Sequence, residues 1–468
     1  MIEEVSRIIE CNLIKKVMGL NKADLVSMWE DGSKYCKESF KKDILKPTGR
    51  GSVYKAADYI TANAYLAACR KFNVDVATLT CKADLKGKLP SAYLFKLGSY
   101  SPMLAARYDE LKEPAQKQLF EKQNYLFTEK QNGVRGWLIH SQGQWFLFSR
   151  NYSDKDCGVL DYWNNIYQHP SLDPKDVLAI DVEIKYEPDS GLANELREMG
   201  IETESILEAM SALLQTYPES AREIQRKYKE RTGKDLIVFR LIYPLYFQGK
   251  NFLKRKLGEG HSAYNEVVKY CQSIGLNVMP IKRVKGNREE KENFLNTILE
   301  SGGEGVVVHN LNAFYCVSEN RDKDGFIKIK RQIGAKKDVI GDTIDAWVSG
   351  FKMSSEKAGN AGIIGALELS TYVLKDDGST KEHVIAYCSN IPLEMRKEIT
   401  KYDEEGRPYM AEEMYGLVFE ATGQSISAVN MRLTHAKIVR QRFDKSKELC
   451  IITEAFLRAN CDTNMYGN

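Results

Sequence analysis

The chain has 468 residues, of which 43% are hydrophobic and 28% are charged, with a formal net charge of +3. This length predicts about three domains of roughly 100–200 residues each, and the apolar fraction is that of a soluble globular protein. No apolar run reaches the roughly 18–20 residues that span a bilayer, which excludes a membrane-spanning helix. The acidic start is unlike a signal peptide, and the ten scattered cysteines are typical of reduced thiols. We therefore expect a cytoplasmic protein, in the host cytoplasm if it is viral.

Residues 1–97 are predicted to form a helical domain. The stretch 55–72 is rich in alanine and has apolar residues at helical spacing. Basic residues are concentrated within 34–55, and two further basic runs lie at 250–256 and 321–337. A single basic run is more often a solvated face, and this domain could be a bundle that only packs on its neighbour. Three runs, together with the signatures below, favour contacts with phosphate groups.

Residues 98–338 are predicted to form one α+β domain. Several apolar runs have the composition and length of buried strands. They lie at residues 136–139, 145–148, 177–184, 236–247 and 305–308. Helical patterns lie between them, in a polar insert at 191–232 and at 263–274. This alternation of strands and helices is typical of a single α+β domain.

Residues 339–468 are predicted to be mainly β-structure. Short strands are expected at 345–351, 364–374, 383–388, 414–421 and 438–443, with a hairpin turn at 375–378. Five short strands in about 110 residues favour an OB-type β-barrel, a fold often used on nucleic acids.

Six short signatures follow one another in a fixed order along the chain. They are 130–135 (KQNGVR), 148–151 (FSRN), 181–183 (DVE), 304–307 (EGVV), 328–330 (KIK) and 442–445 (RFDK). Each one alone is weak, and a lysine beside Asn-Gly is more often part of an exposed hairpin turn. Their order and spacing together indicate a pocket built around Lys130.

The set of signatures resembles that of the covalent nucleotidyltransferases, and most closely the ATP-dependent DNA ligases of the compact phage type. The resemblance covers residues from about 99 to 445. It implies a multidomain α+β protein with a helical DNA-binding domain (1–97), an ATP-grasp-like nucleotidyltransferase domain (98–338) and a C-terminal OB-fold domain (339–468). It also implies a monomeric enzyme that uses ATP and Mg²⁺ to seal nicks in duplex DNA.

The resemblance identifies Lys130 as the nucleophile that takes AMP from ATP. An ε-amine attacks phosphorus only when it is unprotonated, and burial together with neighbouring cations favours that form. The resemblance also implies that Arg135 and Arg150 bind the nucleotide, that Arg150 also contacts the nick phosphate, and that Phe239 stacks on adenine. It places Glu183 at the ribose or metal and Glu304 at the metal. Lys328 and Lys330 are implied as catalytic cations at the α-phosphate, and Arg442 and Lys445 as contacts of the β- and γ-phosphates.

Charge spacing supports part of this assignment independently. Lys328 and Lys330 alternate along a predicted strand, so their side chains lie on the same face. Two lysines on one face of a buried strand repel each other unless an anion lies between them, and a triphosphate would supply that anion. Glu183 and Glu304 end two strand-like runs, and one or two carboxylates with phosphate oxygens suit Mg²⁺. Each glutamate alone is more often a surface residue at a strand end.

Three positions depart from the ligase pattern and keep other functions open. Asn132 stands where the family has aspartate, Arg240 follows Phe239 where an acid is usual, and His309 replaces a common lysine. Asn132 fits an RNA ligase, although RNA ligases generally lack a barrel that ends in the 442–445 signature. An mRNA guanylyltransferase shares most signatures but needs no basic helical domain before them.

Two further alternatives are weaker. The chain could be a nucleic-acid-binding module with a decayed site, but the joint presence of Lys130, Glu183, Glu304, Lys328 and Lys330 argues against decay. NAD⁺ as the nucleotide donor is disfavoured, because no two cysteines have the spacing of the four-cysteine zinc module that accompanies NAD⁺-dependent ligases.

Overall fold

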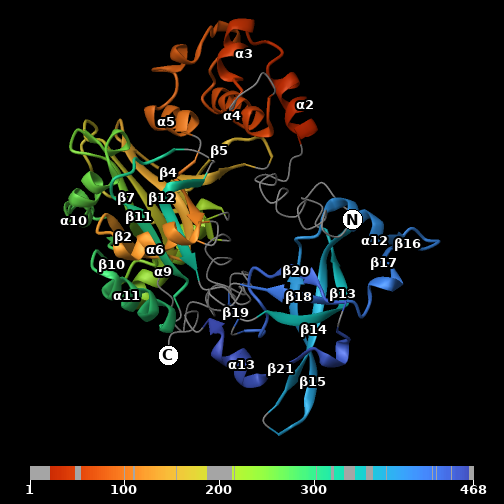
Figure 1. The fold of residues 1–468 in the computed structure, drawn as a ribbon. Helices are drawn as coiled ribbons and strands as arrows, with labels where there is room; N and C mark the ends of the chain where they lie inside the picture. The colour runs from red at the N-terminus through yellow and green to blue at the C-terminus, as the bar shows by residue number, and fades with distance from the viewer. Residues whose placement is uncertain are drawn as a thin grey trace. The chain divides into compact units, whose positions relative to one another are not determined.

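The computed structural model describes the chain in ordered stretches. These are residues 22–47, 54–99, 101–108, 111–153, 155–186, 213–214, 217–301, 303–317, 321–330, 343–354, 362–375, 377–423, 425–427, 429–443 and 445–462. They fall into two compact units that divide between Lys330 and Arg331. Each unit is described by itself, with its helices and strands labelled in Figure 1.

Helices form the first part of the N-terminal unit. Its described residues begin with α2 (Lys22–Gly32), α3 (Glu38–Ile44), α4 (Ala56–Lys71) and α5 (Ser91–Ser99), which are red to orange in Figure 1. The helix expected over 55–72 is α4. It begins after Lys55 because the Asp58 carboxylate accepts a hydrogen bond from the Lys55 amide at 2.6 Å, which satisfies a donor at the helix start.

A five-stranded sheet lies at the centre of this unit, among the described residues. Its order is β1 (Leu104–Arg107), β12 (Arg321–Lys330), β11 (Gly305–Asn310), β2 (Tyr125–Glu129) and β10 (Arg283–Val284). β1 is parallel to β12, and the other pairs are antiparallel. The core beneath it joins Phe127 of β2 to Leu119 of α6 (Glu113–Glu121) and Ile298 of α11 (Arg288–Glu300).

A second sheet in the same unit has seven strands within the described residues. Its order is β5 (Val159–Asp161), β4 (Gln144–Tyr152), β3 (Val134–Ser141), β6 (Leu178–Tyr186), β7 (Ile237–Phe247) and β8 (Lys250–Asn251), with β9 (Val278–Met279) paired to β7. The five strands that the sequence predicted here and in the first sheet are confirmed as β3, β4, β6, β7 and β11; all but β7, which begins one residue later than predicted, are longer than expected.

Two helices accompany the second sheet. The helix predicted at 263–274 is α10 (Leu257–Ser273), which begins six residues earlier and packs on β7. The end of the predicted insert is α9 (Pro218–Thr232), which stops at Gly233, a residue with φ of +70°. Most of the insert, 191–212, lies outside the described residues. Figure 1 shows α10 and α11 in green at the outside of the sheets.

The C-terminal unit is mainly antiparallel β-structure. Its largest described sheet has the order β15 (Thr380–Cys388), β14 (Ile364–Leu374), β13 (Ile344–Met353), β18 (Val418–Thr422) and β20 (Lys437–Gln441), with β21 (Ile451–Thr453) parallel to β14. The strand expected at 414–421 begins only at Val418, because residues 412–414 form a single 3₁₀ turn. At the predicted hairpin, the Lys375 amide donates to Ser379, and Gly378 has φ of +81°.

Smaller elements of this unit were not predicted from the sequence. They are α12 (Leu393–Ile399), α13 (Glu454–Ala459), the pair β16 (Thr400–Tyr402) with β17 (Pro408–Met410), and the pair β19 (Ile426–Ser427) with β22 (Cys461–Asp462). Together with the N-terminal unit they confirm a mixed α+β protein. Among the described residues, no helix is long and apolar enough to cross a membrane.

The core of the five-stranded sheet gives a stability prediction. Phe127 is fully buried between α6, α11 and the sheet. We expect Phe127→Ala to lower the free energy of unfolding by about 3–5 kcal/mol, because it removes buried apolar surface and leaves a cavity. Phe314→Ala is the control, since Phe314 is 53% exposed. Equal urea midpoints for the two variants would contradict this picture of the core.

Candidate active site

Three of the predicted site residues meet around one carboxylate. Lys130 follows β2, Glu304 precedes β11 and Lys330 ends β12. The Lys130 Nζ lies 2.5 Å from Glu304 Oε2, and the Lys330 Nζ lies 2.5 Å from Glu304 Oε1. Each carboxylate oxygen therefore receives one ammonium group. The Glu304 side chain is only 6% exposed, whereas the two lysines are 21% and 23% exposed.

The two lysines decide the charge of Glu304. Burial raises the pKa of its carboxyl group, but the charges and hydrogen bonds of Lys130 and Lys330 outweigh burial and bring that pKa below its ordinary value. Glu304 is therefore an anion at neutral pH. It supplies at Lys330 the negative charge that the sequence had assigned to a triphosphate.

Backbone contacts bring these side chains together. The Lys130 amide donates to the Gly305 carbonyl at 2.8 Å, so the end of β2 is joined to the start of β11. Gly305 has φ of +130°, and a Cβ there would lie 2.1 Å from the Ile329 carbonyl oxygen. Only glycine allows β11 to begin so close to β12. Glu304 is placed beside Lys330 by this contact.

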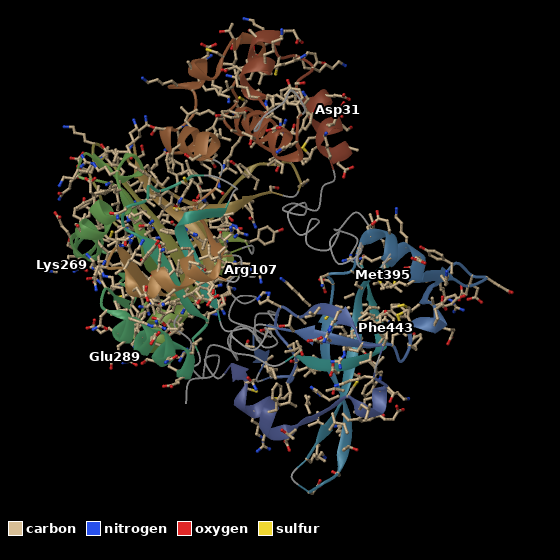
Figure 2. The ribbon with its side chains drawn as sticks, in the orientation of Figure 1. Asp31, Arg107, Lys269, Glu289, Met395 and Phe443 are labelled. Atoms are coloured by element: carbon tan, nitrogen blue, oxygen red, sulfur yellow. The ribbon has the colours of Figure 1, made fainter. Side chains whose placement is uncertain are left out.

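Lys328 lies on the same strand as Lys330, as predicted, and both are half-buried. In the sheet register, Lys328 is opposite Val307 on one side and Arg107 on the other. Figure 2 labels Arg107 on β1. The basic residues of β12 therefore have a further arginine in the neighbouring strand, which the sequence signatures did not indicate.

The second sheet contributes a buried ion pair. Arg135 of β3 donates from Nε and Nη2 to the two oxygens of Asp181, at 3.0 and 2.6 Å. Tyr315 Oη donates to the same carboxylate at 2.7 Å, and Asp181 is fully buried. The sequence assigned Arg135 to the nucleotide and gave Asp181 no role. Asp181 was detectable, because its spacing of two from Glu183 on β6 places both carboxylates on one face.

Glu183 is a carboxylate whose pKa is raised by burial. It is opposite Arg135 in the register of β3 and β6. Burial has the largest effect and raises the pKa of its carboxyl group, Lys130 and Arg135 lower it, and Glu304 and Asp181 raise it by less, so that the pKa is about 7. The influence of Lys130 and Glu304 on this group shows that the two sheets face one site.

A divalent cation would favour the charged form of Glu183, which burial disfavours. The described residues contain no cluster of three or more His, Cys, Asp or Glu side chains suited to a metal. Mg²⁺ does not need one, because it commonly uses one or two carboxylates together with substrate phosphates and water. Glu183 and Glu304 are the two carboxylates available here.

The loop after Lys130 requires glycine for a steric reason. A Cβ on Gly133 would lie 2.4 Å from the Ile184 carbonyl oxygen and 3.1 Å from the Glu183 side chain. Glycine thus allows the loop to lie directly against β6, beside Glu183. Asn132, the departure from the ligase pattern, is half-buried in this loop.

Two predicted nucleotide contacts have opposite environments. Arg150 is exposed near the end of β4. Phe239 is fully buried in β7, opposite Ile184 of β6 and Val278 of β9. Its ring therefore presents no surface to a base in this structure, which is the environment of a core residue.

The last signature lies in the C-terminal unit. Arg442 contacts Asp345 of β13 at 2.9 Å, and Lys445 forms an ion pair with the same carboxylate. Phe443 between them is 70% exposed and is labelled in Figure 2. Asp444 lies outside the described residues. Asp345 was not singled out in the sequence, since nothing in its own strand marks it.

His309, another of the three departures from the ligase pattern, belongs to a buried chain of hydrogen bonds. Its Nδ1 lies 2.8 Å from His261 Nε2, and its Nε2 lies 3.3 Å from Thr128 Oγ1. Burial, followed by the charges of nearby cations, holds the pKa of His309 well below its ordinary value, so the ring is neutral. The lysine that is common at this place in the ligase pattern is thus replaced by an uncharged ring.

Comparison with known proteins gives one family match. Residues 102–330 match the family model described as ATP dependent DNA ligase domain. The comparison with curated protein sequences gave no match. Similar solved structures include a Lig E DNA ligase, with 15% identity, a TM-score of 0.40 and coverage of 73% of this chain and 99% of that one. The bacteriophage T7 ligase in complex with ATP has 14% identity and a TM-score of 0.34, with coverage of 73% of this chain and 99% of that one. The ligase domain of M. tuberculosis LigD has 12% identity, a TM-score of 0.32 and coverage of 75% and 98%.

The family match assigns residues 102–330 to the ATP-dependent DNA ligase domain family, and five of the six signatures fall inside them. The protein is therefore an enzyme that contains an ATP-dependent DNA ligase domain.

The buried pair of the second sheet gives a mutational prediction. We expect Asp181→Asn to lower the free energy of unfolding by about 3–5 kcal/mol, because it leaves the Arg135 guanidinium largely buried without its counterion. Urea denaturation measures the change. Glu223→Gln, which removes the exposed partner of Arg226, is the control and should leave the midpoint unchanged. An Asp181→Asn variant with the urea midpoint of the wild type would contradict the assigned pairing.

The raised pKa of Glu183 gives a pH prediction. The native protein holds this proton up to about pH 7, whereas the unfolded chain loses it near the ordinary value of 4.5. Stability from this group is therefore present at low pH and is lost as the pH rises from about 4.5 through about 7. Without nucleotide or Mg²⁺, the melting temperature of Glu183→Gln should rise relative to wild type between pH 5 and pH 8. A constant difference across that range would contradict the environment described for Glu183.

Proposed function

We propose that the protein seals nicks between a 5′-phosphate and a 3′-hydroxyl in duplex DNA, through a lysyl-AMP and a DNA-adenylate intermediate. The observation that supports this most is the contact of Lys130 with a buried carboxylate that Lys330 shares. A lysine at this place in an ATP-dependent ligase domain has the surroundings of a covalent nucleophile rather than of an exposed turn.

In the first step, Lys130 Nζ attacks the α-phosphorus of ATP. The N–P bond forms as the bond from the α-phosphorus to pyrophosphate oxygen breaks, and pyrophosphate leaves. The amine must lose its proton, and Glu304 Oε2 is the acceptor within hydrogen-bonding distance. Lys330, with Lys328 on the same strand, would stabilise the negative charge that develops on the phosphate oxygens.

Glu183 and Glu304 would hold Mg²⁺. A bound Mg²⁺ neutralises phosphate charge and orients the leaving group. The raised pKa of Glu183 supports this assignment, because a cation there would stabilise the charged form of a carboxyl group that burial disfavours. Arg150 would contact the ribose and later the nick phosphate. Arg135 would complete the nucleotide site from its fixed position on Asp181.

In the later steps AMP passes from Lys130 to the 5′-phosphate of the nick, and the 3′-hydroxyl then displaces AMP. We propose that residues 1–97 serve as a helical DNA-binding domain and 339–468 as an OB-fold domain, with the nucleotidyltransferase domain at 98–338 between them. Arg442 and Lys445 would exchange Asp345 for the β- and γ-phosphates of ATP. Such an enzyme would act as a cytoplasmic monomer on nicks left by replication, repair or recombination.

The covalent step is tested by substitution of the nucleophile. Incubation with ATP labelled in the α-phosphate and Mg²⁺ should attach AMP to the wild-type protein, and Lys130→Ala should abolish the attachment. Lys117→Ala, at an exposed position of α6, is the matched control and should label normally. Covalent labelling that persists in Lys130→Ala would falsify the assignment.

The same preparation tests the substrate. We expect ATP and not GTP to label the protein, and sealing to be faster on nicked DNA than on nicked RNA. Asn132 favours the RNA ligase alternative, because it supplies no carboxylate at a position where the DNA enzymes have one. Faster sealing of an RNA nick would establish that alternative, and labelling by GTP would establish a guanylyltransferase.

A further inference from the structure

Lys96 is a buried cation that lies outside the residues matched to the ligase family. It is on α5, and its side chain is fully buried. The ammonium is 5.3 Å from the centroid of the Trp137 ring and 4.8 Å from that of Tyr152. Burial of an ammonium group costs several kcal/mol, and aromatic faces offset only part of that cost. A further interaction is therefore expected to explain its position.

That interaction is with the backbone of Arg150. The Lys96 ammonium donates a hydrogen bond to the Arg150 carbonyl oxygen at 3.1 Å. The pairing of β4 with β3 ends at Ser149, and its pairing with β5 jumps from Phe148 to Tyr152. The strand is therefore bulged at Arg150, and a bulge redirects the side chain that it carries. Lys96 supplies a donor to this carbonyl from outside the sheet.

A second contact holds α5 to the same strand. Tyr152 Oη donates to the Lys96 carbonyl oxygen at 3.4 Å. Two hydrogen bonds thus join α5 to β4 at the bulge, one donated by Lys96 and one donated by Tyr152. Burial and then the charge of Arg150 lower the pKa of Lys96 to about 7. A neutral amine still donates hydrogen bonds, so the contact does not depend on the charge of Lys96.

We propose that Lys96 is the positioning residue for Arg150, and that it fixes the bulge of β4 so that the guanidinium is held for the nick. The inference rests on the proposed function, in which Arg150 contacts the ribose and the 5′-phosphate. It extends that function, because it makes a side chain of the helical segment part of the support for the second and third steps.

The test compares the sealing of a pre-adenylated nick by four single variants and by the double variant Lys96→Met with Arg150→Ala. Lys96→Met and Lys96→Gln both shorten the side chain by one atom, but Met removes the donor whereas Gln keeps an N–H donor. Arg150→Ala removes the guanidinium that the bulge presents. Lys291→Met is the matched control, because Lys291 is also fully buried and donates to the carbonyls of Leu119, Phe120 and Lys122, away from β4. Rates are expressed per molecule able to form the lysyl-adenylate, so misfolded protein does not contribute.

Lys96→Met should seal at least about tenfold more slowly than wild type, since small displacements of a positioning group have effects of this order or larger. Lys96→Gln should recover part of the rate, and Lys291→Met should match wild type. The double variant Lys96→Met with Arg150→Ala should seal no more slowly than Arg150→Ala alone, because both changes act through the Arg150 guanidinium.

Each outcome decides the proposal. A wild-type rate for Lys96→Met, or effects of Lys96→Met and Arg150→Ala that multiply, would overturn it while wild-type sealing upholds the proposed function. Failure of the wild type to seal any nick would remove the proposed function and this inference with it. If Lys96→Met does not fold, the comparison of Lys96→Gln with and without Arg150→Ala decides by the same rule.

Discussion

One buried carboxylate shared by two lysines is the interaction on which the proposed site depends. Glu304 could not remain ionised at 6% exposure without compensating charge. Lys130 and Lys330 provide that charge, and Glu304 in turn allows two ammonium groups to approach one point without net repulsion. In the free protein, the proposed nucleophile Lys130 is therefore one partner of an ion pair. ATP supplies negative charge that can replace Glu304 beside the lysines, and Mg²⁺ supplies positive charge that can replace the lysines beside Glu304.

The two sheets of the N-terminal unit contribute different residues to the site. The five-stranded sheet carries Lys130, Glu304 and Lys330 at adjoining strand ends. The seven-stranded sheet carries Arg135, which Asp181 and Tyr315 hold in place, and Glu183 beside it. Glycines at 133 and 305 permit the close backbone contacts that bring these elements together. Groups fixed in this way need little rearrangement when a substrate binds, which favours electrostatic catalysis.

Sequence reasoning located the strands and the charged residues on them because both follow short-range rules. Alternation placed Lys328 and Lys330 on one face, and long apolar runs marked β6, β7 and β11. It could not locate Asp345, His261 or Tyr315, because their importance comes only from partners far away in the chain. The same is true of Lys96, which reads as an ordinary helix residue until its contact with Arg150 is seen. Phe239 is the converse case, a residue that was assigned to the site but is buried in the core. An apolar strand pattern does not distinguish a base-stacking ring from a core ring.

The central claim is tested most directly by the rate at which Glu304→Gln forms the lysyl-adenylate in a single turnover with ATP and Mg²⁺. The amide keeps the shape of the side chain but can neither balance two ammonium groups nor accept the proton of Lys130. The account predicts a rate at least about a hundredfold below wild type, which is the usual scale for loss of a positioned proton acceptor. A Glu304→Gln protein that is folded and adenylated at the wild-type rate would contradict it.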